Sequence, residues 1–362
     1  MFITTLISQA LLVSGFSETA GAWENHQPLL PYILEKLSDS DLKILSRKIP
    51  TEFEPSLRKR YETLATSLQL HPHGKLLSTA PDGKIATGAQ LLAVALDDPD
   101  YGMDQDLPPT ADPEGDRPFM GGLTGFRSQG FRHMFFGGWK FSHPIATFQI
   151  PTRALGQSPD RAALTGQHAR ELLHTGDFAW GLRVLGWSAH YIQDLAQPFH
   201  ATQIPNLRMV PWSALLSWPP GKAFGNLVAE TTRSITNFHY AYERYVDHEL
   251  ARGMSSRFYT CLTGTKPLQG NANPLFLAHD VADHSTKIAS ELGSALMSVY
   301  GKLKQPEFDL GNKKGDLDFD RYLEAPEMQN SKNRSRLDEV TCKALNHAVD
   351  SSALLIHWAL QS

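Results

Sequence analysis

The stretch GWSAHYIQDLAQPFHAT, Gly186 to Thr202, combines a helical pattern with residues that a packed helix rarely buries. Its apolar side chains recur at the spacing of an amphipathic α-helix. His190, Asp194 and His200 interrupt this pattern, where Leu or Ala would suit a hydrophobic core better. Two imidazoles and a carboxylate among core residues need a reason, and metal binding would supply one.

The spacing within this stretch predicts how the three side chains are arranged. His190 and Asp194 are four residues apart, so a helix places them on one face with Cβ atoms about 5–6 Å apart. Pro198 cannot continue a helix regularly, and the chain should bend near Gln197 and present His200 from a new direction. The alternative is a hydrogen-bonded core imidazole, the commoner fate of any single histidine.

A second pair, His239 and Glu243, repeats the four-residue spacing in ITNFHYAYERYVDHEL, residues 235–250. His and carboxylate side chains on neighbouring helices are the usual way in which a helical bundle builds a metal site. Imidazole and carboxylate ligands without thiolates suit a catalytic zinc. The alternative for this pair is a solvated surface contact.

Helical periodicity also dominates the rest of the chain, and few segments alternate with the period of two that is typical of strands. The 362 residues are 41% hydrophobic and 20% charged, which suits a globular protein with a sizeable core. We predict an all-α, single-domain multi-helix bundle with long irregular loops around the metal site. The expected helices are 29–46, 55–68, 88–95, 160–173, 178–195, 227–250, 278–303 and 337–360, and the long irregular segments are 97–152 and 204–224.

The beginning of the chain resembles a secretory signal. Residues 2–16 are uncharged and largely apolar, and the small residues Ala20-Gly21-Ala22 follow them. We therefore predict a signal peptide over 1–22 and a mature protein, 23–362, that is secreted to the extracellular space or the periplasm and begins at Trp23. The alternative is a buried helix, because the segment lacks an initial Lys or Arg. No later stretch reaches the roughly 18 apolar residues of a membrane span.

Charge and cysteine content limit the partners and the ligands. A net charge of −4 gives no electrostatic reason to expect nucleic acid as a partner. Cys261 and Cys342 are compatible with one disulfide in an oxidising compartment, or with two buried thiols. Two cysteines cannot form a thiolate zinc site, so His, Asp and Glu must hold any metal.

The His-x3-Asp-x5-His spacing of HYIQDLAQPFHA, followed downstream by His-x3-Glu, resembles the bacterial zinc-dependent phospholipase C family. That family shares its fold with the single-strand-specific zinc nucleases of fungi and plants. The resemblance directly covers Gly186 to Leu250, with scattered positions elsewhere. In this family the mature N-terminus is a tryptophan whose amino group and carbonyl bind zinc, and cleavage after Ala22 would expose Trp23 in that position.

What the resemblance implies is a trinuclear cluster of about three zinc ions. One zinc would be bound by Asp100, His133, His190 and Asp194. Another would be bound by His200, His239 and Glu243. The third would be bound by Trp23 and His26, with Asp194 bridging it to the first.

Two members of this set have rivals in the sequence. Asp100 lies in DDPDYGMD, where the neighbouring acidic residues are Asp97, Asp98 and Asp104. An acidic turn without a metal is the alternative for the whole segment. His133 lies in the apolar and aromatic run GFRHMFF, where a buried imidazole needs a partner, and His143 is its competitor.

The implied activity is that of a phosphoric diester hydrolase, a phospholipase C. A zinc-activated water, with Asp100 as base, would attack the glycerol-side phosphodiester of phosphatidylcholine or phosphatidylglycerol and release diacylglycerol and a phosphorylated head group. The alternatives are a zinc-dependent single-strand nuclease or nucleotidase on the same fold, and a catalytically silent metal-binding module.

The expected partner is a phospholipid substrate at a membrane or micelle surface, met by a monomeric enzyme. The loop MVPWSALLSWPPG lies between His200 and His239 and carries Trp and Leu side chains suited to a lipid interface. Core packing is the alternative for these side chains. They are Trp212, Leu215, Leu216 and Trp218.

Overall fold

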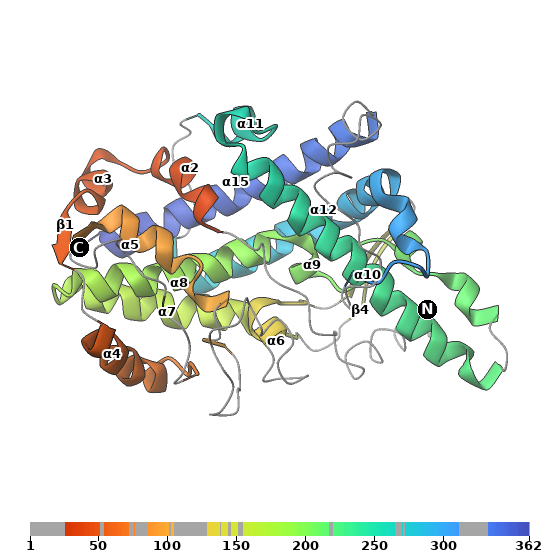
Figure 1. Cartoon of the computed structure of the whole chain (residues 1–362), viewed down its shortest axis with the longest axis horizontal. Helices are drawn as coiled ribbons and strands as arrows, with labels where there is room; N and C mark the ends of the chain where they lie inside the picture. The colour runs from red at the N-terminus through yellow and green to blue at the C-terminus, as the bar shows by residue number, and fades with distance from the viewer. Residues whose placement is uncertain are drawn as a thin grey trace.

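The chain is a mostly helical bundle in the part that the computed structural model describes (Figure 1). Its strands there form two separate two-stranded antiparallel sheets, so the predicted all-α class is confirmed. Residues 1–22, predicted to be a signal peptide, and Trp23 lie outside the described residues. The structure describes residues 26–50, 54–71, 76, 85–100, 103–104, 129–137, 139–143, 146–150, 155–216, 220–264, 270, 272–310 and 332–361.

The elements have the following bounds. The α-helices are α2 (Leu30–Leu34), α3 (Asp39–Leu45), α4 (Glu54–Ser67), α5 (Gly88–Ala95), α6 (Gln129–His133), α7 (Ser158–His174), α8 (Phe178–Ala196), α9 (Pro198–Ala201), α10 (Pro220–Ala251), α11 (Tyr259–Leu262), α12 (Pro274–Tyr300) and α15 (Lys332–Leu360). Short 3-10 helices are η1 (Gln27–Leu29), η2 (Asp98–Asp100), η3 (Leu207–Met209), η4 (Trp212–Leu216), η5 (Gly253–Ser255) and η6 (Gly301–Lys304). The paired strands are β1 (Lys48–Pro50) with β2 (Ile85–Thr87), and β3 (Trp139–His143) with β4 (Ala146–Ile150).

Most of the predicted helices are present with small changes at their ends, but the single helix expected over 29–46 was wrong. Ser38 starts a new helix there, because its hydroxyl accepts from the Asp41 amide at 3.3 Å and the Asp41 carboxylate accepts from the Ser38 amide at 3.2 Å. This reciprocal capping box satisfies amides that a continuous helix would have used internally. The segment is therefore divided between α2 and α3.

The two segments predicted to be long and irregular contain regular structure. Residues 97–152 hold α6 and the β3–β4 hairpin, in which Trp139 pairs with Ile150 and His143 with Ala146. Residues 204–224 hold η3, η4 and the first turn of α10. The strands were missed because five residues of alternating pattern give too weak a signal without their partner.

Helix α8 is the centre of the bundle, since every residue from Trp180 to Ala196 is buried. It packs against α5, α7, α12 and α15, and α7 runs alongside it in Figure 1. Gly186 permits the approach of α5, because a Cβ there would lie 2.6 Å from that of Ala95. The chain that follows α5 is thereby carried to the part of α8 that holds His190.

The bend predicted at Pro198 is present. Gln197 is extended, with φ −81° and ψ 114°, and its side-chain oxygen accepts from the Phe199 amide at 2.6 Å. Helix α9 then starts with Pro198, where the missing amide costs nothing. Among the helices that the structure describes, none combines the length and apolarity needed to cross a lipid bilayer.

A disulfide joins Cys261 on α11 to Cys342 on α15. Of the two alternatives that the sequence left open, the disulfide is therefore the one present. The two cysteines are 81 residues apart in sequence, so the bond closes a long loop in the unfolded chain.

We expect the double variant Cys261→Ser/Cys342→Ser to lose about 4–5 kcal/mol of unfolding free energy, because removing the cross-link restores loop entropy to the unfolded chain. Urea denaturation followed by circular dichroism measures this difference. A reducing agent should shift the wild-type curve and leave the double variant unchanged. Identical midpoints for the two proteins without reductant would contradict the expectation.

Candidate metal centre

The centre is built around Asp194, which is fully buried on α8. His190 lies one turn earlier on the same face, with its Nε2 atom 3.2 Å from Asp194 Oδ2. His200 comes from α9, and its Nδ1 atom lies 3.9 Å from Asp194 Oδ1. The bend at Gln197 thus brings the third residue of the opening motif back to the same carboxylate.

Helix α10 supplies the second predicted pair. His239 Nε2 lies 2.8 Å from Glu243 Oε1, and His200 Nε2 lies 3.9 Å from the same oxygen. The ring of Phe199 stacks on His239 with 5.1 Å between centroids and 9° between planes, which orients the imidazole. His200, His239 and Glu243 are arranged as a group that can hold a metal ion.

Asp100 and His133 complete a second group with His190. Asp100 Oδ1 lies 3.8 Å from His133 Nδ1 and 3.7 Å from His190 Nε2. His133 Nδ1 lies 2.8 Å from Asp194 Oδ2, so this group also reaches the central carboxylate. The side chain of His143, the competitor of His133, lies outside the described part of the structure.

His26 forms the third group with His190 and Asp194. Its Nε2 atom lies 3.5 Å from Asp194 Oδ1, and the ring is fully buried. Trp23, the partner expected for His26, lies outside the described residues. Every sequence-predicted ligand that the structure describes is therefore part of one buried cluster.

The far ring nitrogens of three histidines are held by acceptors. His26 Nδ1 donates to Gln193 Oε1 at 2.9 Å, and His133 Nε2 donates to Asp104 Oδ2 at 3.0 Å. His190 Nδ1 donates to the Leu96 carbonyl at 2.6 Å. Amide, carboxylate and carbonyl oxygens can only accept, so in each neutral ring the other nitrogen directs its lone pair into the cluster. This support is typical of metal-binding histidines.

The acidic rivals of Asp100 each have another partner. Asp97 accepts from the His26 amide at 2.8 Å and from the Gln27 side chain at 2.6 Å. Asp98 accepts two hydrogen bonds from the guanidinium of Arg183, at 2.7 and 3.1 Å. Asp104 supports the His133 ring, while Asp100 faces the lone pairs of two histidines. The structure therefore favours Asp100 over its rivals as the metal ligand.

Asp104 and Gln193 support the centre, although the sequence offered Asp104 only as a rival of Asp100 for the metal and did not single out Gln193. Asp104 is held by Arg161 at 3.1 Å, by Arg132 at 3.3 Å and by a short hydrogen bond from the Tyr191 hydroxyl. Gln193 also donates to the Ser352 hydroxyl of α15 at 3.2 Å. Their only sequence signal is that each lies near an expected ligand, which many residues share.

The residues fit a bound cation in two respects. Within the described chain neither ring nitrogen of His200 has a hydrogen-bond partner, although the side chain is 2% exposed. His133 Nδ1 and His190 Nε2 lie 3.1 Å apart, where two neutral rings would oppose their lone pairs. Unpaired buried nitrogen is costly, so a proton or a metal ion is needed here.

Protonation divides the histidines into two classes. Burial opposes charge on His26 and His133, but nearby carboxylates, above all that of Asp194, outweigh it and raise the pKa of these rings to about 9 and about 10. Burial lowers the pKa of His200 and His239 to about 3, and the negative charge of Asp194 does not reverse this. In the metal-free protein two protonated rings thus neutralise buried acid.

Comparison of the chain with protein-family models, with curated proteins and with solved structures finds no match.

We expect Asp194→Asn to lower metal affinity at least about 100-fold, because Asp194 contacts all three ligand groups and a neutral amide attracts cations weakly. Competition titration against a chromophoric chelator measures this change. Asp160→Asn, on the exposed surface of α7, is the matched control and should bind metal like the wild type. Equal affinity of the two variants would exclude Asp194 from the site.

Metal binding near pH 8 should release about two protons per chain, because His26 and His133 must lose their protons to become ligands. Both pKa values lie above this pH, so affinity should increase as the pH rises toward 9–10. Calorimetric titration in buffers of different ionisation enthalpy counts the protons. The His26→Gln variant should release about one proton fewer. Heats that do not depend on the buffer would contradict this prediction.

Proposed function

We propose that the protein is a secreted, zinc-dependent phospholipase C. It cleaves the glycerol-side phosphodiester of phosphatidylcholine or phosphatidylglycerol and releases diacylglycerol and a phosphorylated head group. The observation that carries the proposal is the convergence of three buried His and carboxylate groups on Asp194. Clusters of metal ions a few ångströms apart are characteristic of enzymes that hydrolyse phosphate esters.

Distances in the best-defined group support zinc. Tetrahedral zinc with bonds of about 2.0–2.1 Å has ligand atoms about 3.3–3.4 Å apart. The measured separations among the facing atoms of Asp100, His133, His190 and Asp194 are 2.8, 3.1, 3.2, 3.7 and 3.8 Å. Both cysteines are used in the disulfide, which leaves the nitrogen and oxygen ligands of a catalytic zinc. We assign one of about three zinc ions to each group.

The third ion is assigned to His26 and Asp194, together with the amino group and carbonyl of Trp23 if the chain is cleaved after Ala22. Secretion agrees with the disulfide, since such bonds persist in oxidising compartments. N-terminal sequencing of the secreted protein tests the cleavage site directly.

The side chains have distinct tasks in the proposed reaction. Bound zinc supplies a Lewis acid and lowers the pKa of water toward neutrality. Asp194 contacts all three ligand groups and holds them in position. Asp100 accepts the proton of the attacking water. The exposed fraction of the ligand side chains rises from 0% at Asp194 to 8% at His239, so the phosphodiester approaches from the side of α10.

Exposed apolar residues favour a lipid over a nucleic acid substrate. Trp212 and Leu216 of η4 are 40% and 88% exposed, whereas Leu215 packs against the core. Trp218 lies outside the described residues. The net charge of −4 also differs from that of a single-strand nuclease, which needs cations along its groove.

The purified, zinc-loaded protein should release phosphorylated head group from dispersions of phosphatidylcholine or phosphatidylglycerol and should leave single-stranded DNA intact. Chelation should abolish turnover and added zinc should restore it, because the ligand groups act only when occupied. Phosphate analysis of the aqueous phase and gel electrophoresis measure the two activities.

Two outcomes would overturn the proposal. Cleavage of DNA without lipid turnover would identify the nuclease or nucleotidase alternative. Near-zero zinc in the native protein, with no turnover of either substrate, would identify a catalytically silent module.

A further inference from the structure

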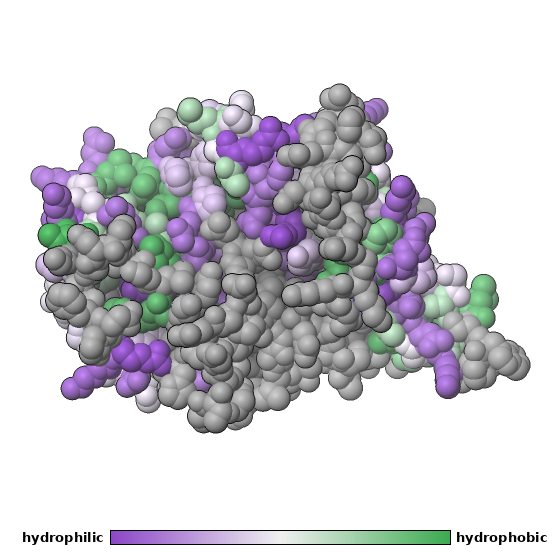
Figure 2. All heavy atoms as spheres, viewed as in Figure 1, coloured by the Kyte–Doolittle hydropathy of each residue, from purple (hydrophilic) through white to green (hydrophobic). Residues whose placement is uncertain are grey.

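Large apolar side chains are exposed where η4 meets the start of α10. Trp212, Leu216 and Phe224 are 40%, 88% and 37% exposed, and we call these three residues the apolar corner. This end of α10 projects from the bundle in Figure 1, and Figure 2 shows hydrophobic surface on the projection. Burying a leucine of this exposure in an apolar medium is worth about 1.5–3 kcal/mol, so the corner favours a partner.

Exposed cations lie around the apolar corner, although the protein as a whole is negative. Residues 195–229 contain no Asp or Glu, while Arg208 and Lys222 are exposed. Lys304 of η6 adds a third cation beside them, since its Nζ atom donates to the Arg208 carbonyl at 2.6 Å. The nearest carboxylate along α10, Glu230, is paired with Arg233 at 2.6 Å. Charge complementarity therefore indicates an anionic partner.

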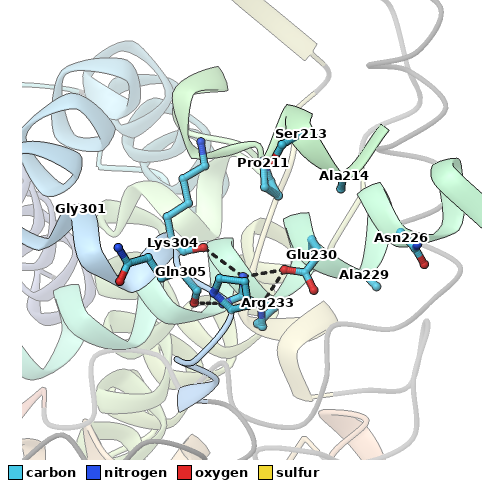
Figure 3. A pocket seen from close by; sticks show the side chains of 11 residues that line it. Pro211, Ser213, Ala214, Asn226, Ala229, Glu230, Arg233, Gly301, Lys304 and Gln305 are labelled. Carbon is cyan, nitrogen blue, oxygen red and sulfur yellow. Dashed lines mark hydrogen bonds and ion pairs between the residues drawn. The ribbon is translucent and has the colours of Figure 1, made fainter. Parts of the chain in front are cut away.

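An open hollow of about 710 Å³ adjoins the corner between η4, α10 and η6 (Figure 3). Arg233 holds the wall of the hollow in place. It donates hydrogen bonds to the carbonyls of Lys304, Gln305 and Phe308, and it pairs with Glu230. The guanidinium of Arg233 therefore makes its hydrogen bonds within the protein. Lys304 also lines the hollow and extends toward η4, so it supplies the cation there.

We propose that the apolar corner docks the protein on an anionic phospholipid bilayer. The three apolar side chains enter the interface while Arg208, Lys222 and Lys304 contact lipid head groups. A second copy of the chain fits less well, because a symmetric contact would bring these cations together. Three side chains also fall far short of the roughly 1,200 Å² buried in a stable dimer.

Docking is separate from catalysis in space. Phe224 and His239 lie fifteen residues apart on α10, which corresponds to about 22 Å along the helix. The apolar corner therefore lies away from the metal centre. It anchors the protein without touching the reacting phosphodiester. This inference rests on the proposed function, because it takes a lipid surface as the place where the enzyme acts.

Co-sedimentation with vesicles of equal parts phosphatidylglycerol and phosphatidylcholine tests the proposal. Leu216→Asp should lower the partition coefficient at least about tenfold, since it removes an inserted side chain and adds repulsion. Met254→Asp is the matched control, because Met254 is an 80% exposed apolar residue of η5, beyond the opposite end of α10. It should bind like the wild type. Added salt should weaken wild-type binding to these vesicles more than to pure phosphatidylcholine.

Phosphate released from a short-chain phosphatidylcholine below its micellar concentration is measured on the same proteins. Leu216→Asp should retain this activity. Equal partitioning of both variants and the wild type would overturn the docking proposal, as would an altered oligomeric state of Leu216→Asp with unchanged vesicle binding. Vesicle binding without phosphate release from any lipid would instead reject the phospholipase activity and leave the docking surface supported.

Discussion

The structure depends on the burial of one carboxylate, that of Asp194, in the middle of α8. An unpaired ionised carboxylate in a protein interior is so costly that it must be paired or coordinate a metal. Imidazoles of His26, His133 and His200 reach it from other segments of the chain, and that of His190 reaches it from the same helix. The requirement for positive charge at this point therefore helps to fix where the start of η1, helix α6 and helix α9 meet α8. A bound metal ion would supply this positive charge. In the metal-free protein, two protonated histidines supply it.

Further polar contacts hold these ligands in place. Asp98 is anchored by Arg183 and by the Trp187 indole at 2.9 Å, which fixes the turn that presents Asp100. Asp104 accepts a hydrogen bond from His133 Nε2 and so fixes the orientation of this ring. Such networks stabilise a unique arrangement only when every member is satisfied, and at the cluster the ring nitrogens of His200 and the oxygens of Asp194 have no hydrogen-bond partner among the described residues. The polar groups at the centre of the bundle are therefore arranged so that they could hold metal ions.

The sequence predicted the long helices because their apolar residues repeat over many turns, as in α8 and α10. It predicted His190, Asp194, His239 and Glu243 as neighbours because a four-residue spacing fixes side-chain positions within one helix. It did not predict the β3–β4 hairpin or the break between α2 and α3, which depend on short-range pairing and a capping box. It also gave no means of separating Asp100 from its acidic neighbours, because all have the same chemistry.

The sequence by itself determined the helical class, the bend at Pro198 and the spacing of ligands within each helix, because local backbone geometry governs these features. Only the tertiary structure decided that His26 and His133 converge on Asp194 and that Asp100 lies beside His133 and His190, since such contacts join segments that are up to 168 residues apart. It also decided which side chains of the η4 loop are exposed. Burial and long-range pairing are properties of the packed chain, and residue order does not specify them until the helices are placed against one another.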